Sequence, residues 1–317
     1  MQINHCLILA AGYGTRMGKI GQVIPKVLWP VYEKSLLELQ VAYAKSLGAE
    51  KIYINLHHMS RDVLDFCKRK SIFDDVEFLE EQPSILDIGG AVHNLAAQPK
   101  VDYKGKLLIL NADQFFYLKP EVMNKYLGLY PDAPAVLFSF FVEADHGYNA
   151  LKINNRSEVV GIVKNANLEK GSRVETYTGI SYINLEKLTV TKGASSFFES
   201  VCPFKEKKIP VISLENVDYW DFGTLKRYWD TMFRLLRTYS KNSNHPFIRF
   251  LVNEKALKTW KIDFLKSSYH SATPQVINLS DDKNTNDIGP AIILESTSAV
   301  KKSGNNVFWK NISEEVI

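Results

Sequence analysis

The sequence predicts an α/β fold, in which a doubly wound, mostly parallel, Rossmann-like sheet carries a small inserted β-sheet and a short C-terminal left-handed β-helix. Three observations favour it: strand and helix patterns alternate from residue 1 to about 143, strand patterns alone follow from 148 to about 188, and aliphatic residues recur every six positions near the C-terminus. Strand–helix alternation favours parallel pairing with helices on both faces. A six-residue aliphatic period is typical of a coil with flat faces.

The alternating segment is expected to open with a short buried strand and to continue in regular order. The expected strands are Cys6–Leu9, Lys51–Leu56, Val76–Glu80, Leu107–Asn111 and Ala135–Val142, and the expected helices are Ser35–Leu47, Ser60–Lys70, Gly90–Ala97 and Pro120–Tyr130. Ser60 is expected to cap its helix, and Pro120 stands where a first-turn proline is tolerated. Ligands of such sheets bind at the carboxyl ends of the strands, so we expect the site there.

The pattern of expected secondary structure changes twice in the second half of the chain. A hairpin is expected around Asn154-Asn155-Arg156-Ser157, then a strand at Gly179–Leu185 and a helix at Leu225–Leu236. Near the C-terminus, aliphatic residues recur every six positions at Ile288, Leu294, Val300 and Ile312, with a break at Asn306. This period predicts the β-helix, and an irregular aliphatic tail is the alternative. We therefore expect a main domain at 1–240, a linker or helical segment at 241–274 and the β-helix-like tail at 275–317.

Composition narrows the class of protein. The 317 residues suffice for one large domain with an appendage or for two medium domains, and 45% are hydrophobic. A net charge of +4 gives no reason to expect a nucleic-acid or membrane partner. Cys6, Cys67 and Cys202 form no C-x-x-C pair and are expected to be buried free thiols. No signal-peptide pattern or membrane-length apolar run is found, so a cytoplasmic location is expected.

A glycine-rich turn with two nearby cations follows the first expected strand. It reads Ala10-Ala11-Gly12-Tyr13-Gly14-Thr15-Arg16-Met17, and Pro25-Lys26 comes soon after. Exposed backbone N–H groups and a guanidinium suit a polyphosphate. The P-loop pattern fails because five residues separate Gly12 from Gly18, and the dinucleotide fingerprint fails because Met17 replaces its third glycine.

Two carboxylates are candidate metal ligands. Asp113 ends an apolar strand, and Asp221 lies between aromatic residues shortly before an expected helix. A buried carboxylate is costly unless it is paired or binds a metal ion. Taken with the glycine turn, the pair predicts one Mg²⁺ held over phosphates. The alternatives are a strand-end turn residue for Asp113 and a helix N-cap for Asp221.

These segments together resemble the sugar-1-phosphate nucleotidyltransferases, whose signature L-x-A-G-x-G-T-R-[ML] is followed by P-K. The similarity covers residues 1 to about 235 and is strongest to N-acetylmuramate-1-phosphate uridylyltransferases and mannose-1-phosphate guanylyltransferase-like proteins. Its further matches are Glu81-Gln82-Pro83 through Ala91, Asn111-Ala112-Asp113, Tyr177-Thr178-Gly179-Ile180 and Trp220-Asp221-Phe222-Gly223-Thr224. The resemblance implies the nucleotide-diphospho-sugar transferase fold and an enzyme that joins a nucleoside triphosphate to a sugar-1-phosphate, releasing pyrophosphate.

The resemblance also implies roles for individual residues. Arg16 and Lys26 would hold the triphosphate and the sugar phosphate as catalytic residues, and Asp113 and Asp221 would hold Mg²⁺. Nucleotide contacts are expected at Ala10, Ala11, Gly12, Gly14, Thr15, Gln82, Asp87 and Gly90, and sugar-phosphate contacts at Gly147, Lys164, Thr178 and Gly179. The base (UTP, GTP or CTP) and the sugar stay open, because Asp87 replaces the family's usual glycine or glutamate and Val163-Lys164-Asn165 replaces E-K-P.

Two other functions remain alternatives. One is a phosphocholine-type cytidylyltransferase on the same fold, for which Tyr148 and Tyr177 would offer aromatic faces to a quaternary ammonium. The other is a non-catalytic regulatory subunit that binds an NDP-sugar, against which the intact cations and carboxylates argue. About one and a half coils bury no core alone, so residues 275–317 are expected to pack on the catalytic domain or to form a homo-oligomer.

Overall fold

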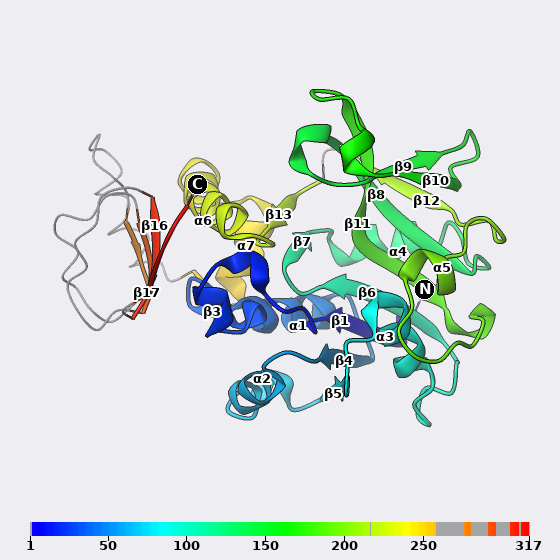
Figure 1. Ribbon diagram of the computed structural model, residues 1–317, viewed down its shortest axis with the longest axis horizontal. Helices are drawn as coiled ribbons and strands as arrows, with labels where there is room; N and C mark the ends of the chain where they lie inside the picture. The colour runs from blue at the N-terminus through cyan, green and yellow to red at the C-terminus, as the bar shows by residue number, and fades with distance from the viewer. Residues whose placement is uncertain are drawn as a thin grey trace.

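A central sheet organises the part of the chain that the computed structural model describes, residues 2–215, 217–257, 276–279, 291–295, 305–310 and 312–316. Its main path runs β10-β9-β11-β6-β1-β4-β5, with β8 paired beside β11 and β12 paired beside β8 (Figure 1). The strands are β1 His5–Leu9, β4 Lys51–Leu56, β5 Val76–Glu80, β6 Lys106–Asn111, β8 Ala135–Glu143, β9 Ala150–Ile153, β10 Val159–Val163, β11 Arg173–Asn184 and β12 Val211–Leu214.

The pairing confirms the predicted parallel centre and corrects its edge. Strands β6, β1, β4 and β5 are parallel neighbours. Strand β8, expected to continue the parallel series, keeps the direction of β6 but does not pair with it, because β11 lies between them and is antiparallel to both. The predicted hairpin β9–β10 is present, and the pair Thr176–Ala150 joins it to the main sheet through β11. The long strand β11 therefore links the inserted strands to the centre.

The helices begin for local reasons that the sequence partly predicts. They are α1 Leu36–Ser46, α2 Ser60–Cys67, α3 Asp87–Ala96, α4 Pro120–Leu127, α5 Phe197–Ser200, α6 Leu225–Lys241 and α7 Pro246–Asn253. Ser35 and Glu38 form a capping box at α1, and Pro120 occupies the first turn of α4 as predicted. The predicted Ser60 cap is wrong: Met59 takes the N-cap place, and the Ser60 hydroxyl donates to Glu80 Oε2 at 2.9 Å.

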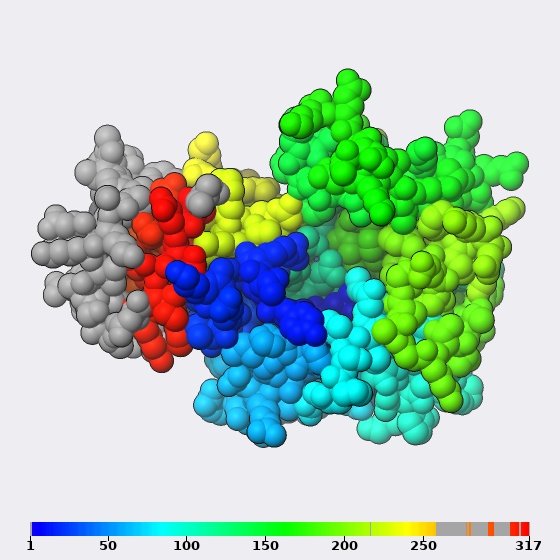
Figure 2. Space-filling model, viewed as in Figure 1, coloured from blue at the N-terminus to red at the C-terminus, as the bar shows by residue number. Residues whose placement is uncertain are grey.

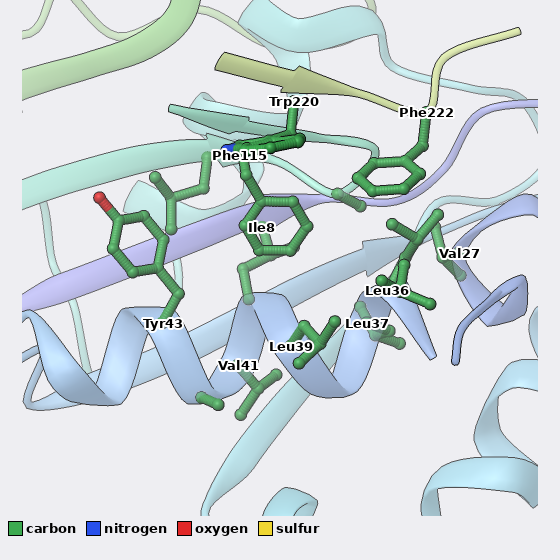
Figure 3. Packing of buried hydrophobic residues seen from close by; sticks show 14 of the residues in the cluster. Ile8, Val27, Leu36, Leu37, Leu39, Val41, Tyr43, Phe115, Trp220 and Phe222 are labelled. Atoms are coloured by element: carbon green, nitrogen blue, oxygen red, sulfur yellow. The ribbon is translucent and has the colours of Figure 1, made fainter. Parts of the chain in front are cut away.

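Each face of the sheet has its own hydrophobic cluster, because side chains alternate along a strand. Cys6 and Ile8 of β1 join the larger cluster, to which α1, α2, α4, α6 and α7 contribute. Leu7 between them joins the second cluster with α3 and α5. Figure 3 shows α1 packing its apolar face beneath Ile8, Phe115, Trp220 and Phe222. The three cysteines are buried and free, as predicted.

The C-terminal strands form a small sheet of their own order β14-β15-β16-β17 (Val276–Asn278, Ala291–Glu295, Asn306–Trp309, Ile312–Glu315). The first three are parallel and in register at a step of 15 residues, Val276 beside Ala291 and Ala291 beside Asn306. Strand β17 turns back antiparallel to β16. A left-handed β-helix built from three six-residue faces would instead repeat every ~18 residues. The left-handed β-helix therefore stays a prediction. Ile288, Val300 and residues 258–274 lie outside the described residues.

The tail shares the core of the main domain, as expected for residues 275–317. Ile277, Ile292, Val307 and Val316 belong to the same buried cluster as α1 and α6, and Figure 1 shows the tail strands beside that side of the fold. Within the described residues no helix has the length and apolarity needed to cross a membrane.

Ile292→Ala is expected to lower the free energy of unfolding of the whole protein by about 2–5 kcal/mol, because Ile292 is fully buried in that shared cluster. Urea unfolding followed by tryptophan fluorescence measures the change. Val190→Ala, at a side chain 59% exposed, is the control and should change little. An early transition of the tail with an unchanged main transition would show that the tail is not part of the core.

Candidate functional site

A short two-stranded ladder brings the two candidate carboxylates together. Strand β7 (Gln114–Phe116) pairs antiparallel with β13 (Tyr219–Asp221), with Asp221 opposite Gln114. The Phe222 N–H then donates to the Asp113 carbonyl at 2.9 Å, which extends the ladder by one step. Two residues more than one hundred positions apart thus stand side by side at the end of β6, where an α/β sheet is expected to bind its ligand.

Lys26, from the N-terminal part of the chain, contacts both segments at the Asp113 end of this ladder. Its ammonium is ion-paired with Asp113 Oδ2 and donates to the Gly223 carbonyl at 2.7 Å. The lysine and aspartate side chains are 11% and 20% exposed, so the pair borders solvent. An ammonium has three donors, and two are used here. Among the residues that the structure describes, no partner takes the third donor.

Asp221 is buried and held by four donors. Its Oδ2 accepts from the hydroxyls of Tyr148 and Tyr219 and from Arg227 Nη1 at 2.9 Å, and its Oδ1 accepts from the Gly223 N–H at 2.6 Å. Burial, reinforced by the Asp221 charge, raises the pKa of both tyrosines, so both hydroxyls stay protonated donors. The N-cap alternative for Asp221 is wrong, because Thr224 caps α6 by accepting from the Arg227 N–H.

Arg227 ties Asp221 to the loop that precedes β9. Its guanidinium lies 4.5 Å from the centroid of the Tyr148 ring, and Nη2 donates to the His146 carbonyl at 2.5 Å. Gly147 follows, in the left-handed region at φ 79°. The expected sugar-phosphate residue Gly147 therefore lies beside Arg227 and near the carboxylates.

The two carboxylates fit a divalent cation. A Cβ placed on Gly223 would lie 2.7 Å from Asp221 Oδ1 and 3.5 Å from Asp113 Oδ2, so both oxygens face one small space. A carboxylate oxygen has two acceptor sites, and within the described part of the chain Asp221 Oδ1 accepts only from Gly223. Mg²⁺ is commonly held by one or two carboxylates with substrate phosphates and water. Within the described residues no cluster of three or more His, Cys, Asp or Glu side chains could hold a metal ion.

The glycine turn is largely open to solvent, as a phosphate-binding loop requires. Gly12, Thr15 and Arg16 are exposed, and Gly14 takes a left-handed conformation before the short 3-10 helix Thr15–Met17. Ala10 and Ala11 are buried, and the Ala10 N–H donates to Asn55 Oδ1 at 2.8 Å. Figure 2 shows a hollow between the blue N-terminal segment, the cyan segment around α3 and the green inserted strands.

A buried carboxylate orders the expected base-reading loop. Glu81 is 1% exposed; its Oε1 accepts from Asn55 Nδ2 at 2.8 Å and its Oε2 accepts from the Leu86 N–H at 2.7 Å. Asn55 is the residue that also holds Ala10. One network therefore joins the glycine turn to the loop at 82–87, of which Gln82 and Asp87 are exposed.

Gly90 serves packing in this structure. It is buried, and its N–H donates to the Ser195 carbonyl at 3.2 Å. The geometry does not bring it to the exposed end of the loop with Gln82 and Asp87.

Of the remaining residues expected to contact the sugar phosphate, one is exposed and two are used within the fold. Lys164 is exposed, whereas the Thr178 hydroxyl is buried and donates to the Phe138 carbonyl at 2.8 Å. Gly179 lies at φ 82°, and a Cβ there would come within 2.0 Å of Asn111 Nδ2, so only glycine fits this bulge of β11. Thr178 and Gly179 shape the backbone next to Asn111, and Lys164 is an exposed cation with no ion-pair partner among the described residues.

Sequence reasoning missed Arg227, Tyr219, Asn55 and Glu81. Arg227 carried a usable signal: a cation in the first turn of a helix opposes the helix dipole unless a carboxylate holds it. Glu81 and Asn55 gave weaker signals, as polar residues at the ends of apolar strands. The hydroxyl of Tyr219 could be assigned only once the ladder of β7 and β13 was known.

Known proteins resemble this chain in sequence and in fold. Residues 6–159 match the family model of the MobA-like NTP transferase domain. The predicted resemblance to nucleotidyltransferases is confirmed. The bifunctional protein GlmU of Marinobacter nauticus is 32% identical over 186 residues, 58% of this chain and 38% of that protein. A bifunctional sugar-1-phosphate nucleotidylyltransferase/acetyltransferase of Sulfurisphaera tokodaii is 23% identical over 225 residues, 68% of this chain and 51% of that protein.

The chain thus spans between about two fifths and one half of these relatives. Among solved structures, HddC of Yersinia pseudotuberculosis superposes with a TM-score of 0.60 at 20% identity, covering 73% of this chain and 99% of that chain. A UDP-glucose pyrophosphorylase complexed with UDP-glucose gives 0.58 at 18% identity, covering 76% and 100%. These likenesses establish the mixed α/β fold with its mostly parallel centre.

A second titratable cluster lies behind the carboxylates. Burial raises the pKa of Asp218 to about 7, and the Arg234 guanidinium offsets only part of that effect. His245 Nε2 is 3.6 Å from Asp218 Oδ1, and burial lowers the pKa of this imidazole. The Arg234 guanidinium lies 4.0 Å from the centroid of the Trp220 ring. This cluster supports the strand that carries Asp221.

Asp218→Asn is expected to stabilise the protein in a pH-dependent way. The unfolded carboxyl releases its proton near pH ~4 and the folded one near pH 7, so the wild-type contribution to stability falls as pH rises through this window. The variant should match wild type near pH 4 and gain up to about 4 kcal/mol by pH 7 to 8. Urea unfolding at several pH values measures this, with the exposed Asp230→Asn as control. A pH-independent difference would contradict the assignment.

Asp221→Asn is expected to lower stability by about 1–3 kcal/mol, because an amide nitrogen placed among four donors leaves Arg227 without its carboxylate. Asp113→Asn should cost less, since its side chain is more exposed and has one cationic partner. Thermal unfolding of both variants without added metal measures the contrast. Equal effects at the two positions would show that the donor network around Asp221 is not formed.

Proposed function

We propose that the protein is a nucleotidyltransferase that joins a nucleoside triphosphate and a sugar-1-phosphate to give an NDP-sugar and pyrophosphate. The observation that carries this is the meeting of Lys26, Asp113, Asp221 and Gly223 at the end of β6, beside an exposed glycine turn that bears Arg16. The relative named as a bifunctional sugar-1-phosphate nucleotidylyltransferase/acetyltransferase supports it.

The chemistry needs positioning and charge neutralisation more than a protein nucleophile. A sugar-1-phosphate is largely a dianion at neutral pH, since a phosphate monoester has its second pKa near about 6. One of its oxygens attacks the α-phosphorus, and the bond to the oxygen bridging the α- and β-phosphorus breaks, so that pyrophosphate leaves with both electrons of that bond. Arg16 and the turn's N–H groups would bind the triphosphate, and the free donor of Lys26 would hold an oxygen of the transferring phosphate.

Asp113 and Asp221 would hold Mg²⁺ between them, and the ion would neutralise phosphate charge. Arg227 orients Asp221 and keeps the loop containing Gly147 close to it. Glu81 and Asn55 keep the base-reading loop, with Gln82 and Asp87, in register with the turn. Lys164 supplies a cation for the sugar phosphate from the inserted strands, with Thr178 and Gly179 shaping the adjoining backbone.

The aromatic faces that would favour phosphocholine are already occupied. The Tyr148 ring carries the Arg227 guanidinium, and the Tyr177 ring stacks on Phe197 at 5.6 Å while its hydroxyl donates to Ser181. A quaternary ammonium would have to displace these partners. The geometry therefore favours a sugar phosphate over a phosphoalcohol as the second substrate.

A substrate matrix tests the function. UTP, GTP and CTP are each combined with sugar-1-phosphates and with phosphocholine in the presence of Mg²⁺, and pyrophosphate release is measured. We expect release only when a triphosphate and a sugar-1-phosphate are present together. Triphosphate cleavage without a sugar phosphate would indicate a hydrolase, and tight NDP-sugar binding without any turnover would indicate a regulatory subunit.

Asp113→Asn is expected to lower turnover about a hundredfold or more while leaving the fold intact, because it removes charge next to the transferring phosphate. The exposed Asp132→Asn is the matched control and should keep wild-type turnover. A magnesium titration at saturating substrates measures the effect. Wild-type turnover with unchanged magnesium dependence would remove Asp113 from the site.

A further inference from the structure

The C-terminal strand β17 makes a polar contact with the segment that follows the glycine turn. Glu314 Oε1 accepts from the backbone N–H of Lys19 at 2.6 Å. A Cβ placed on Gly18 would lie 2.8–3.1 Å from the Glu314 side chain, so the carboxylate arm also packs directly on the chain there. Figure 2 shows the red C-terminal segment lying against the blue N-terminal segment.

Lys19 begins a short turn that packs back on the glycine turn. It precedes the 3-10 helix Ile20–Gln22, whose first N–H groups have no partner within the helix. A carboxylate on the N–H at this end acts as a cap supplied from another part of the chain. Glu314 therefore fixes where this turn begins.

The turn in its place shapes the phosphate-facing loop. A Cβ on Gly21 would lie 2.6 Å from the Gly14 carbonyl and 2.5 Å from Met17 Cβ, so the two turns are in direct contact. The Met17 N–H donates to the same Gly14 carbonyl at 2.9 Å. Gly14 and Met17 flank Thr15 and Arg16. A shift at Lys19 is thus transmitted to the residues that would bind the triphosphate.

We propose that Glu314 is a positioning residue that couples the C-terminal tail to triphosphate binding by capping the turn at Lys19. The inference rests on the proposed function for its substrate, but the contact itself is independent of turnover. The tail is anchored by its own buried residues, Ile292 and Val307 among them. Glu314 is then presented by a fixed strand, and losing the tail would loosen the loop.

The carboxylate's role as an acceptor gives a sharp test. Glu314→Gln keeps an acceptor oxygen, Glu314→Ala removes it, and Glu315→Ala changes the same charge at an exposed neighbour. Lys19→Pro removes the donor without altering the backbone, because Lys19 already has φ −62°. Lys19→Ala keeps the donor and is its control. This second pair keeps the proposal testable if Glu314→Ala fails to fold.

Limited trypsin digestion tests, without any substrate, whether the contact keeps the loop ordered. Cleavage after Arg16 and Lys19 is followed by mass spectrometry in the intact chain. We expect Glu314→Ala to speed both cuts about three- to tenfold, the range that loss of a helix cap gives. Glu314→Gln and Glu315→Ala should cleave like wild type. Lys19→Pro should speed the Arg16 cut, and Lys19→Ala should not.

Steady-state kinetics, with the substrate pair identified by the substrate matrix, measures the effect of the contact on triphosphate binding. Glu314→Ala should raise KM for the triphosphate about three- to tenfold, with KM for the sugar phosphate unchanged, and Glu314→Gln should restore it. Tighter triphosphate binding in Glu314→Ala would overturn the proposal in favour of an inhibitory carboxylate. Wild-type digestion and kinetics in Glu314→Ala, or equal effects in Glu315→Ala, would also overturn it. Altered digestion in Glu314→Ala with no turnover by the wild type would instead reject the proposed function and leave the contact standing.

Discussion

The antiparallel pairing of β7 with β13 is the constraint on which the site depends. Asp113 lies after a central strand and Asp221 lies more than one hundred residues later, and neither position by itself forms a site. The ladder fixes their separation through backbone hydrogen bonds, which do not depend on side-chain identity. Its own side chains anchor it: Phe115, Trp220 and Phe222 are buried in the cluster beneath α1. The hydrophobic core thus positions two charged groups that it does not itself contain.

Each of the two carboxylates is paired with a cationic side chain. Lys26 holds Asp113, and Arg227 with two tyrosine hydroxyls holds Asp221. Two carboxylates close together would repel each other without such partners. The partners also fix the orientation of each carboxylate, so the proposed binding of a cation and two anions would require little rearrangement. This arrangement suits a reaction whose barrier is lowered by fixed charges in a preorganised site.

Local pattern predicted much of the fold, and long-range pairing explains where it failed. Lys51–Leu56 and Val76–Glu80 are observed with the predicted bounds, because apolar runs between turn residues mark buried strands. The neighbour of β8 was mispredicted, since alternation with helices does not show that β11 would lie between β8 and β6, antiparallel to both. The six-residue period in the tail likewise gave no sign of the 15-residue step observed between its parallel strands.

The site was predictable where a motif is local and not where it is assembled by packing. Arg16, Lys26, Asp113 and Asp221 stand in short sequence patterns, and the structure brings Lys26 and both aspartates together. Thr178 and Gly90 stand in equally clear patterns, yet their polar groups are used within the fold. The contacts of Glu81, Arg227 and Glu314 all cross between elements, and no spacing in the sequence reports them.

The glycine turn shows why such contacts matter for function. An exposed loop whose N–H groups face solvent has little of its own to hold one shape. Here it is held at both ends: Asn55 accepts from Ala10 where the loop begins, and Glu314 accepts from Lys19 just after it ends. The first contact leads through Glu81 to the loop at 82–87, and the second leads to the tail. A polyphosphate bound between these two points would therefore act on both, so order in the base loop and docking of the tail should each favour the same loop shape.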